Sequence, residues 1–103
     1  MIQYPAYKVV AAHVAPVFMD VGATIDKACS LIREAARNGA QLVVFPETYV
    51  PAFPLWCALQ APIHNHDLFR ALAANSIRVC GTELQLVADT AREVGVFVSL
   101  GFN

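Results

Sequence analysis

An apolar run, a helical stripe and a second apolar run follow one another in the first 45 residues, and this order constrains the fold most. Residues 8–14 form a short apolar run that is typical of a buried strand. Asp20 can cap a helix that ends at Asn38-Gly39, where glycine can take the left-handed conformation. Residues 41–45 are apolar with a β-branched centre, which is typical of a strand covered on both faces. The stripe between the two runs consists of Ile25, Cys29, Ile32 and Ala36. We therefore predict a β-α-β unit whose parallel strands have ligand sites beyond their carboxyl ends.

The rest of the chain adds two helices and a third strand to this unit. Residues 46–65 contain four prolines and several aromatic residues, so no regular structure is expected there. Residues 67–79 are expected to be helical. Thr82 and Gln85 can form a capping box at the start of a further helix, and residues 96–102 complete the sheet as a strand. The order predicts a small α/β sheet that is incomplete as a fold.

The composition also indicates an incomplete fold. Of the 103 residues, 57% are hydrophobic and 15% are charged, whereas soluble domains have about 25% charged residues. We expect further chain or another subunit to cover some of the apolar surface. A net charge of -1 without a basic cluster argues against nucleic acid or an anionic membrane as partner. The apolar segment 8–19 is too short for a membrane span and lacks a signal-peptide cleavage site, so a cytoplasmic location is expected.

The cysteines and histidines give no metal site. Cys29, Cys57 and Cys80 are odd in number and widely spaced, which argues against a disulfide framework and offers no zinc-binding pair. His64 and His66 form a His-x-His pair, but a zinc site needs further ligands nearby. Entry into the following helix is the favoured role for this pair, and no metal is expected.

Glu47 follows the second apolar run and is the first candidate for chemistry. A glutamate after a strand is most often a solvated loop residue. The alternative is a catalytic carboxylate in a pocket of low dielectric constant, where the pKa of a carboxyl group rises and the group can shuttle a proton near neutral pH. The aromatic residues expected to line that pocket are Phe45, Tyr49, Phe53 and Trp56. Position alone does not decide between the two interpretations.

Three stretches decide between them by resemblance. Residues 8–18, the stretch "IDKACSLIREAARNGAQLVVFPETYVPAFP" and the stretch "VGVFVSLGFN" resemble the first third of the nitrilase, or carbon-nitrogen hydrolase, superfamily, from about residue 8 to residue 103. The stretch "HNHDLFRALAANSIRV" is more similar to the nitrile-hydrolysing branch than to the amidase and carbamoylase branches. The resemblance implies that residues 1–103 are the N-terminal fragment of a single domain, a four-layer α-β-β-α sandwich.

The resemblance also implies a mechanism. Glu47 matches the family's general base, with Tyr49, Phe53 and Trp56 expected to contact a small nitrile substrate. The family's catalytic lysine and cysteine lie further along the chain than residue 103, and neither Lys8 nor Lys27 fits the lysine's role. The implied reaction converts a nitrile into a carboxylic acid and ammonia through a cysteine thioimidate, without metal or organic cofactor. We expect the 103-residue chain alone to be inactive and the full-length form to be a homo-oligomer.

Many relatives have Gly-Tyr where this chain has Ala52-Phe53, which predicts a more apolar pocket for an aryl or alkyl nitrile. The stretch "VCGTE" around Cys80 resembles the family's nucleophile motif, but it follows a helical segment instead of a strand.

The alternatives to a nitrile-hydrolysing function are an amidase or carbamoylase of the same superfamily, or a truncated, non-catalytic interaction module.

Overall fold

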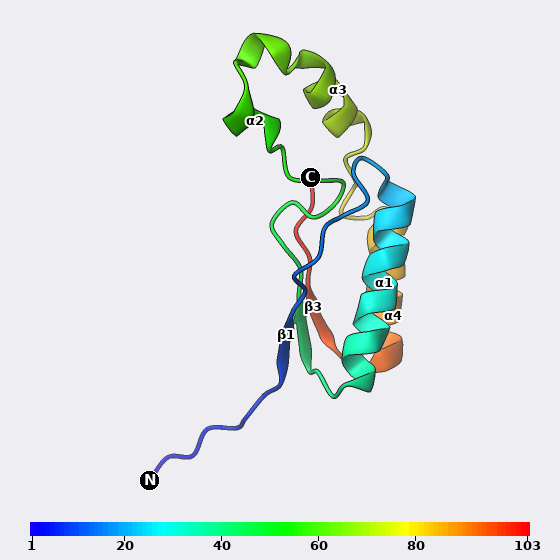
Figure 1. Ribbon diagram of the computed structural model, residues 1–103. Helices are drawn as coiled ribbons and strands as arrows, with labels where there is room; N and C mark the ends of the chain where they lie inside the picture. The colour runs from blue at the N-terminus through cyan, green and yellow to red at the C-terminus, as the bar shows by residue number, and fades with distance from the viewer.

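The computed structural model describes residues 1–103 and contains a three-stranded parallel sheet (Figure 1). The strands are β1 (Val9–Ala11), β2 (Leu42–Val44) and β3 (Phe97–Ser99), and they lie in the order β1-β2-β3. Both pairs of neighbouring strands are parallel, which confirms the predicted β-α-β unit. All three carboxyl ends therefore lie at the same edge of the sheet.

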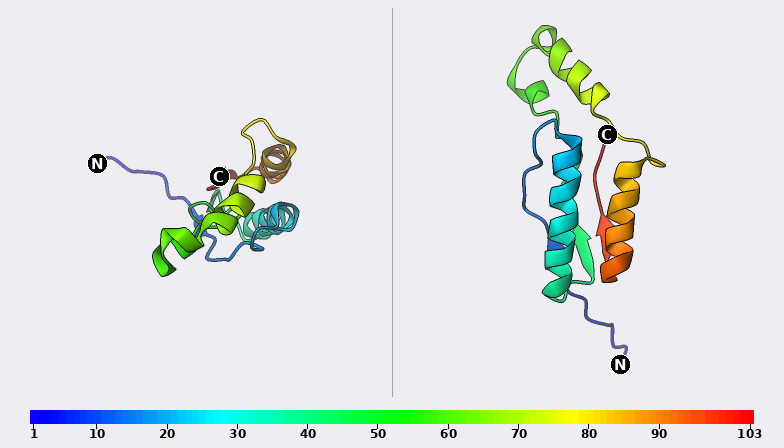
Figure 2. Two further views of the ribbon diagram at one scale, coloured as in Figure 1. Left: turned by 90° about the horizontal axis from the view of Figure 1, so that it is seen from above. Right: turned by 90° about the vertical axis from the view of Figure 1, so that its right-hand side faces the viewer.

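Helices α1 (Val21–Arg37) and α4 (Thr82–Val94) lie side by side on one face of the sheet (Figure 2). The ends of α1 follow the predicted signals. The Asp20 carboxylate accepts a hydrogen bond of 2.9 Å from the Ala23 backbone N–H. At the other end Gly39 has a φ of 84°, the left-handed conformation that glycine adopts without a steric penalty.

The predicted capping box at the start of α4 is wrong. The N-cap position is Gly81, in extended conformation, and Thr82 is already the first helical residue. A capping box needs the hydroxyl residue at the N-cap itself, so Thr82 lies one position too late. Its hydroxyl group contacts the Glu83 carboxylate at 3.5 Å, and the Gln85 amide donates to Asp89 at 2.8 Å.

The proline-rich segment 46–65 was expected to lack regular structure, but it contains α2 (Trp56–Leu59) and a 3₁₀ helix (Pro62–His64). Single turns of this length carry no repeating apolar stripe, and proline fits the first turn of a helix. Helix α3 follows at His66–Ala74, shorter than the predicted 67–79. It ends early because the amide and hydroxyl side chains that follow it donate to carbonyl groups in its last turns.

The core lies between the sheet and the two long helices. Ile25, Cys29 and Ile32 of the predicted stripe are buried there against Val43 of the middle strand. Ala36 is only half-buried, and Ala35 takes its place in the core. No helix in the structure is both long and apolar enough to span a membrane.

The opposite face of the sheet is open. Val9 and Phe97 on the outer strands are 53% and 79% exposed. With Tyr7, Gln41 and Leu42 they surround an apolar hollow of about 470 Å³. The expectation that the second strand is covered on both faces is therefore wrong for these 103 residues, since their helices cover one face only.

Candidate active site at the carboxyl end of the sheet

Glu47 lies in a turn beyond the carboxyl end of β2, the middle strand. The strand ends at Val44, and Phe45 and Pro46 lead the chain out of the sheet. The Glu47 side chain is exposed, and its carboxylate forms no hydrogen bond or ion pair with other residues of the chain. The carboxylate is thus exposed in residues 1–103, and not enclosed in the pocket of low dielectric constant that the catalytic interpretation expected. It lies at the edge where parallel sheets place their ligands.

The turn that holds Glu47 is tightly constrained. Thr48 has a φ of 47°, which is uncommon for a β-branched residue. The Thr48 hydroxyl oxygen is buried and has no hydrogen-bond partner. After the turn, Val50 forms an isolated parallel bridge with Phe102, beyond the end of β3. The turn is therefore held between the ends of two neighbouring strands.

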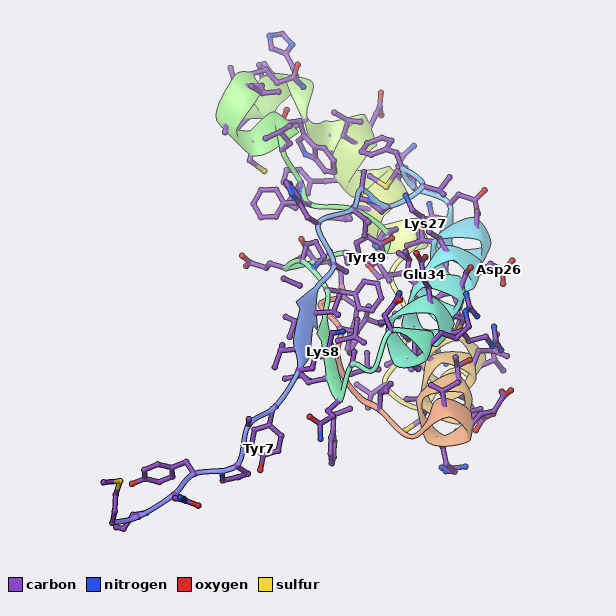
Figure 3. The ribbon with its side chains drawn as sticks, turned by 60° about the horizontal axis from the view of Figure 1, so that its bottom comes forward. Tyr7, Lys8, Asp26, Lys27, Glu34 and Tyr49 are labelled. Carbon is purple, nitrogen blue, oxygen red and sulfur yellow. The ribbon has the colours of Figure 1, made fainter.

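Tyr49 was expected to line the pocket, but the structure buries it in the core. Its side chain is 1% exposed, and its ring packs on Phe45 with centroids 5.2 Å apart. The hydroxyl group donates to the Ala15 carbonyl oxygen at 3.3 Å, and Figure 3 shows Tyr49 directed toward helix α1. Burial raises the pKa of the Tyr49 phenol above its usual 10.0. Two of the four aromatic residues expected around Glu47 thus pack the core instead.

Trp56 is also largely buried, between two other aromatic rings. It is 6% exposed at the start of α2, and its ring meets Phe18 edge-on at 6.3 Å and Phe69 edge-on at 5.5 Å. The indole N–H is buried without a hydrogen-bond partner. Phe53, in contrast, is 51% exposed. Among the aromatic candidates, Phe53 is the one whose ring is accessible, and contact of Phe53 or Trp56 with a substrate stays a prediction.

Both lysines bond to backbone carbonyl groups of the fold. Lys8 Nζ donates to the Asn38 carbonyl oxygen at the C-terminus of α1, which a cation stabilises. Lys27 Nζ donates to the Ala15 carbonyl oxygen at 2.6 Å, beside the Tyr49 hydroxyl group (Figure 3). That neither lysine is the catalytic one stays a prediction.

The other cysteines and histidines do not join Glu47. Cys29 is buried, as its place in the stripe predicted, whereas Cys57 and Cys80 are exposed. His64 ends the 3₁₀ helix and His66 begins α3, so this pair does lie at a helix entry. The structure brings together no group of three or more His, Cys, Asp or Glu side chains that could hold a metal ion.

Asn65 lies between the two histidines. It occupies the N-cap position of α3, but its side chain does not cap the helix. Instead its amide oxygen accepts a hydrogen bond of 2.7 Å from the Gln60 amide. This bond ties the entry of α3 to the end of α2.

Gly101 was not among the residues singled out from the sequence. It follows β3, and its backbone lies directly against the turn at residues 46–48. One sequence signal was available, because a glycine inside a strand pattern such as residues 96–102 often marks a close approach of another backbone.

A family model for carbon-nitrogen hydrolases matches residues 3–103, almost the whole chain. The chain belongs to the carbon-nitrogen hydrolase family. The match confirms the resemblance that the three stretches between residues 8 and 103 indicated. It also assigns this α/β segment, with its parallel sheet, to that family's fold.

Three relatives of this carbon-nitrogen hydrolase chain carry nitrilase names. It is 45% identical over 96 residues to the arylacetonitrilase of Hypocrea virens and 38% identical over 96 residues to a nitrilase of Pseudomonas syringae pv. syringae. It is 34% identical over 105 residues to the aliphatic nitrilase of Rhodococcus rhodochrous. The alignments cover 93%, 93% and 100% of this chain but only 29% of each relative. The chain therefore spans under a third of the length of these curated relatives.

Proposed function

We propose that this chain is the N-terminal portion of a nitrilase, in which Glu47 is the general base. The observation that carries the proposal is the free, exposed Glu47 carboxylate beyond the carboxyl end of the middle strand. Family membership and the nitrilase names of three relatives support the substrate class. The relatives' names include an arylacetonitrilase and an aliphatic nitrilase, so the proposed substrate is a small nitrile that carries an aryl or an alkyl group.

The proposed reaction needs a cysteine and a lysine from chain beyond these residues. The thiol sulfur bonds to the nitrile carbon while the thiol proton passes through Glu47 to the nitrile nitrogen, which gives a thioimidate. Water then adds to the same carbon, and Glu47 carries one proton from the water oxygen to nitrogen. The remaining hydroxyl proton passes through Glu47 to nitrogen as the carbon-nitrogen bond breaks, so ammonia leaves and a thioester remains. A second water releases the carboxylic acid and restores the thiol. The lysine stabilises the negative charge that develops on nitrogen and oxygen.

The open face of the sheet fits the same proposal. In a four-layer sandwich a second sheet packs on the first, and face-to-face sheets need an apolar surface between them. Val9, Leu42 and Phe97 provide such a surface here. We propose that the remainder of the domain packs on this face. A cytosolic location and a homo-oligomeric assembly remain predictions from the sequence.

The test uses a complete enzyme, in which residues 1–103 are followed by the rest of a nitrilase, from their own reading frame or from the Hypocrea virens arylacetonitrilase. Ammonia release is measured with an arylacetonitrile, benzonitrile, an aliphatic nitrile and the matching amides. The proposal expects at least one nitrile to be turned over faster than its amide. Faster turnover of every amide would indicate an amidase instead. Absence of turnover in a folded complete enzyme would favour a non-catalytic module.

A further inference from the structure

Gly101 lies closer to the Glu47 turn than any other residue type would allow. A Cβ atom built on Gly101 would lie 2.5 Å from the Thr48 backbone nitrogen, 2.6 Å from the Pro46 carbonyl oxygen and 2.9 Å from the Glu47 Cα. Non-bonded carbon atoms normally approach one another to about 3.5–4.0 Å. All three neighbours are backbone atoms, so no side chain can rotate away to relieve the contact. A substitution at Gly101 must therefore move the turn or the end of β3.

Backbone hydrogen bonds hold the two segments together on both sides of the turn. Before it, the Phe45 N–H donates to the Ser99 carbonyl oxygen at 2.8 Å. After it, the Val50 N–H donates to the Gly101 carbonyl oxygen at 3.2 Å, and the Asn103 N–H donates to the Val50 carbonyl oxygen at 2.9 Å. These bonds prevent the turn from sliding along the third strand. A displacement forced at Gly101 is therefore passed to the main chain of Glu47.

We propose that Gly101 is a positioning residue for the reaction, because its missing side chain lets the third strand hold the Glu47 turn in place. This inference rests on the proposed role of Glu47 as general base. A misplacement of about 1 Å can cost about 10²-fold in rate, since proton transfer requires a donor-acceptor distance within hydrogen-bond reach. Gly101 contributes no group to the chemistry and acts through the geometry of Glu47 alone.

Gly101→Ala in the complete enzyme is the first test, with Gly22→Ala as its control. Gly22 lies in α1, and a Cβ built there would meet only the Asp20 carboxylate oxygen, at 3.8 Å. For Gly101→Ala we expect kcat for the nitrile to fall about 10²-fold with a smaller change in KM. For Gly22→Ala we expect wild-type kcat. Assays run well below the melting temperature of each variant, and circular dichroism checks the folded state.

A double-mutant cycle with Glu47→Gln separates positioning from general damage to the fold. If Gly101 acts through Glu47, adding Gly101→Ala to Glu47→Gln costs little further activity. If the two losses multiply instead, Gly101 acts independently of Glu47 and the inference is overturned. Wild-type kcat in Gly101→Ala also overturns it. Full activity in Glu47→Gln, by contrast, defeats the proposed function itself, so the two failures are distinguishable.

A second variant applies if Gly101→Ala does not fold. Thr48→Gly loosens the same turn without adding an atom, because glycine adopts the positive φ of residue 48 freely. We expect a folded enzyme with lower kcat and a KM near that of the wild type. Wild-type kcat in Thr48→Gly would show that the position of the turn does not limit the reaction, and would overturn the inference.

Discussion

The indole ring of Trp56 packs edge-on against the ring of Phe69, with centroids 5.5 Å apart and planes at 78°. The contact joins the start of α2 to the middle of α3 and buries the indole almost completely. From the sequence, Trp56 was expected to lie in a segment without regular structure and to contact the substrate. The burial of Trp56 instead indicates a contribution to stability, and its contact with a substrate stays a prediction.

Trp56→Ala should therefore destabilise the protein. Truncation of a buried tryptophan costs about 3–5 kcal/mol because packing contacts are lost and a cavity remains. The matched variant is Phe53→Ala, since the Phe53 ring is half exposed. It should leave the melting temperature nearly unchanged but alter the ranking of nitrile substrates. Melting curves and relative kcat/KM values for the complete enzyme check both. Equal losses of stability in the two variants would contradict the distinction.

Glu47→Gln should abolish most of the activity and leave the fold intact. The side chain is exposed and unpaired, so an amide of the same size disturbs no contact. Since general-base catalysis contributes about 10²–10⁴-fold, kcat should fall by at least about 10²-fold. Glu47→Asp should lose nearly as much, because the carboxylate is withdrawn by one methylene group. A Glu47→Gln enzyme that keeps more than about a tenth of its activity has lost under about 1.4 kcal/mol, too little for a general base.

Tyr49→Phe tests the buried hydroxyl group. At neutral pH the variant should lose about 0.5–1.5 kcal/mol of stability, the usual net value of a hydrogen bond, here the one to the Ala15 carbonyl oxygen. The pKa of Tyr49 is raised by burial above 10.0. Below about pH 10 both the folded and unfolded states keep the phenolic proton, so Tyr49 adds no pH dependence there.

Above pH 10 the unfolded chain loses the Tyr49 proton first, so the free energy of unfolding falls as pH rises through the raised pKa of the folded state. Tyr49→Phe lacks this loss. The stability advantage of the wild type should therefore shrink between neutral pH and strongly alkaline pH in chemical denaturation of the complete enzyme. An advantage that grows with pH in this range would be the opposite result.

Residues 1–103 made alone should self-associate and release no ammonia from nitriles. The reason for association is the apolar sheet face, where Val9 and Phe97 are more than half exposed. The reason for inactivity is that the proposed mechanism needs a cysteine and a lysine that the Glu47 site does not contain. Light scattering and an ammonia assay check the two parts. Ammonia release that is lost after thiol alkylation would instead point to the exposed Cys57 or Cys80.

The sequence alone was sufficient for the β-α-β order, the caps of α1, the buried Cys29 and the position of Glu47 after the second strand. These features depend on local interactions, namely the period of apolar residues along a helix or strand and hydrogen bonds between near neighbours in the chain. The family was indicated by three stretches that together cover much of the chain, since Phe-Pro-Glu alone would be a weak signal.

The tertiary structure decided which aromatic residues are accessible and what holds the Glu47 turn. Tyr49 is buried because it packs in the core together with residues of helix α1. Trp56 is buried because Phe69 of α3 packs against it. Gly101 touches the turn only because parallel pairing brings the carboxyl ends of β2 and β3 together. Such contacts join segments far apart in the chain, so neither the spacing nor the type of the residues reveals them until the strands are paired.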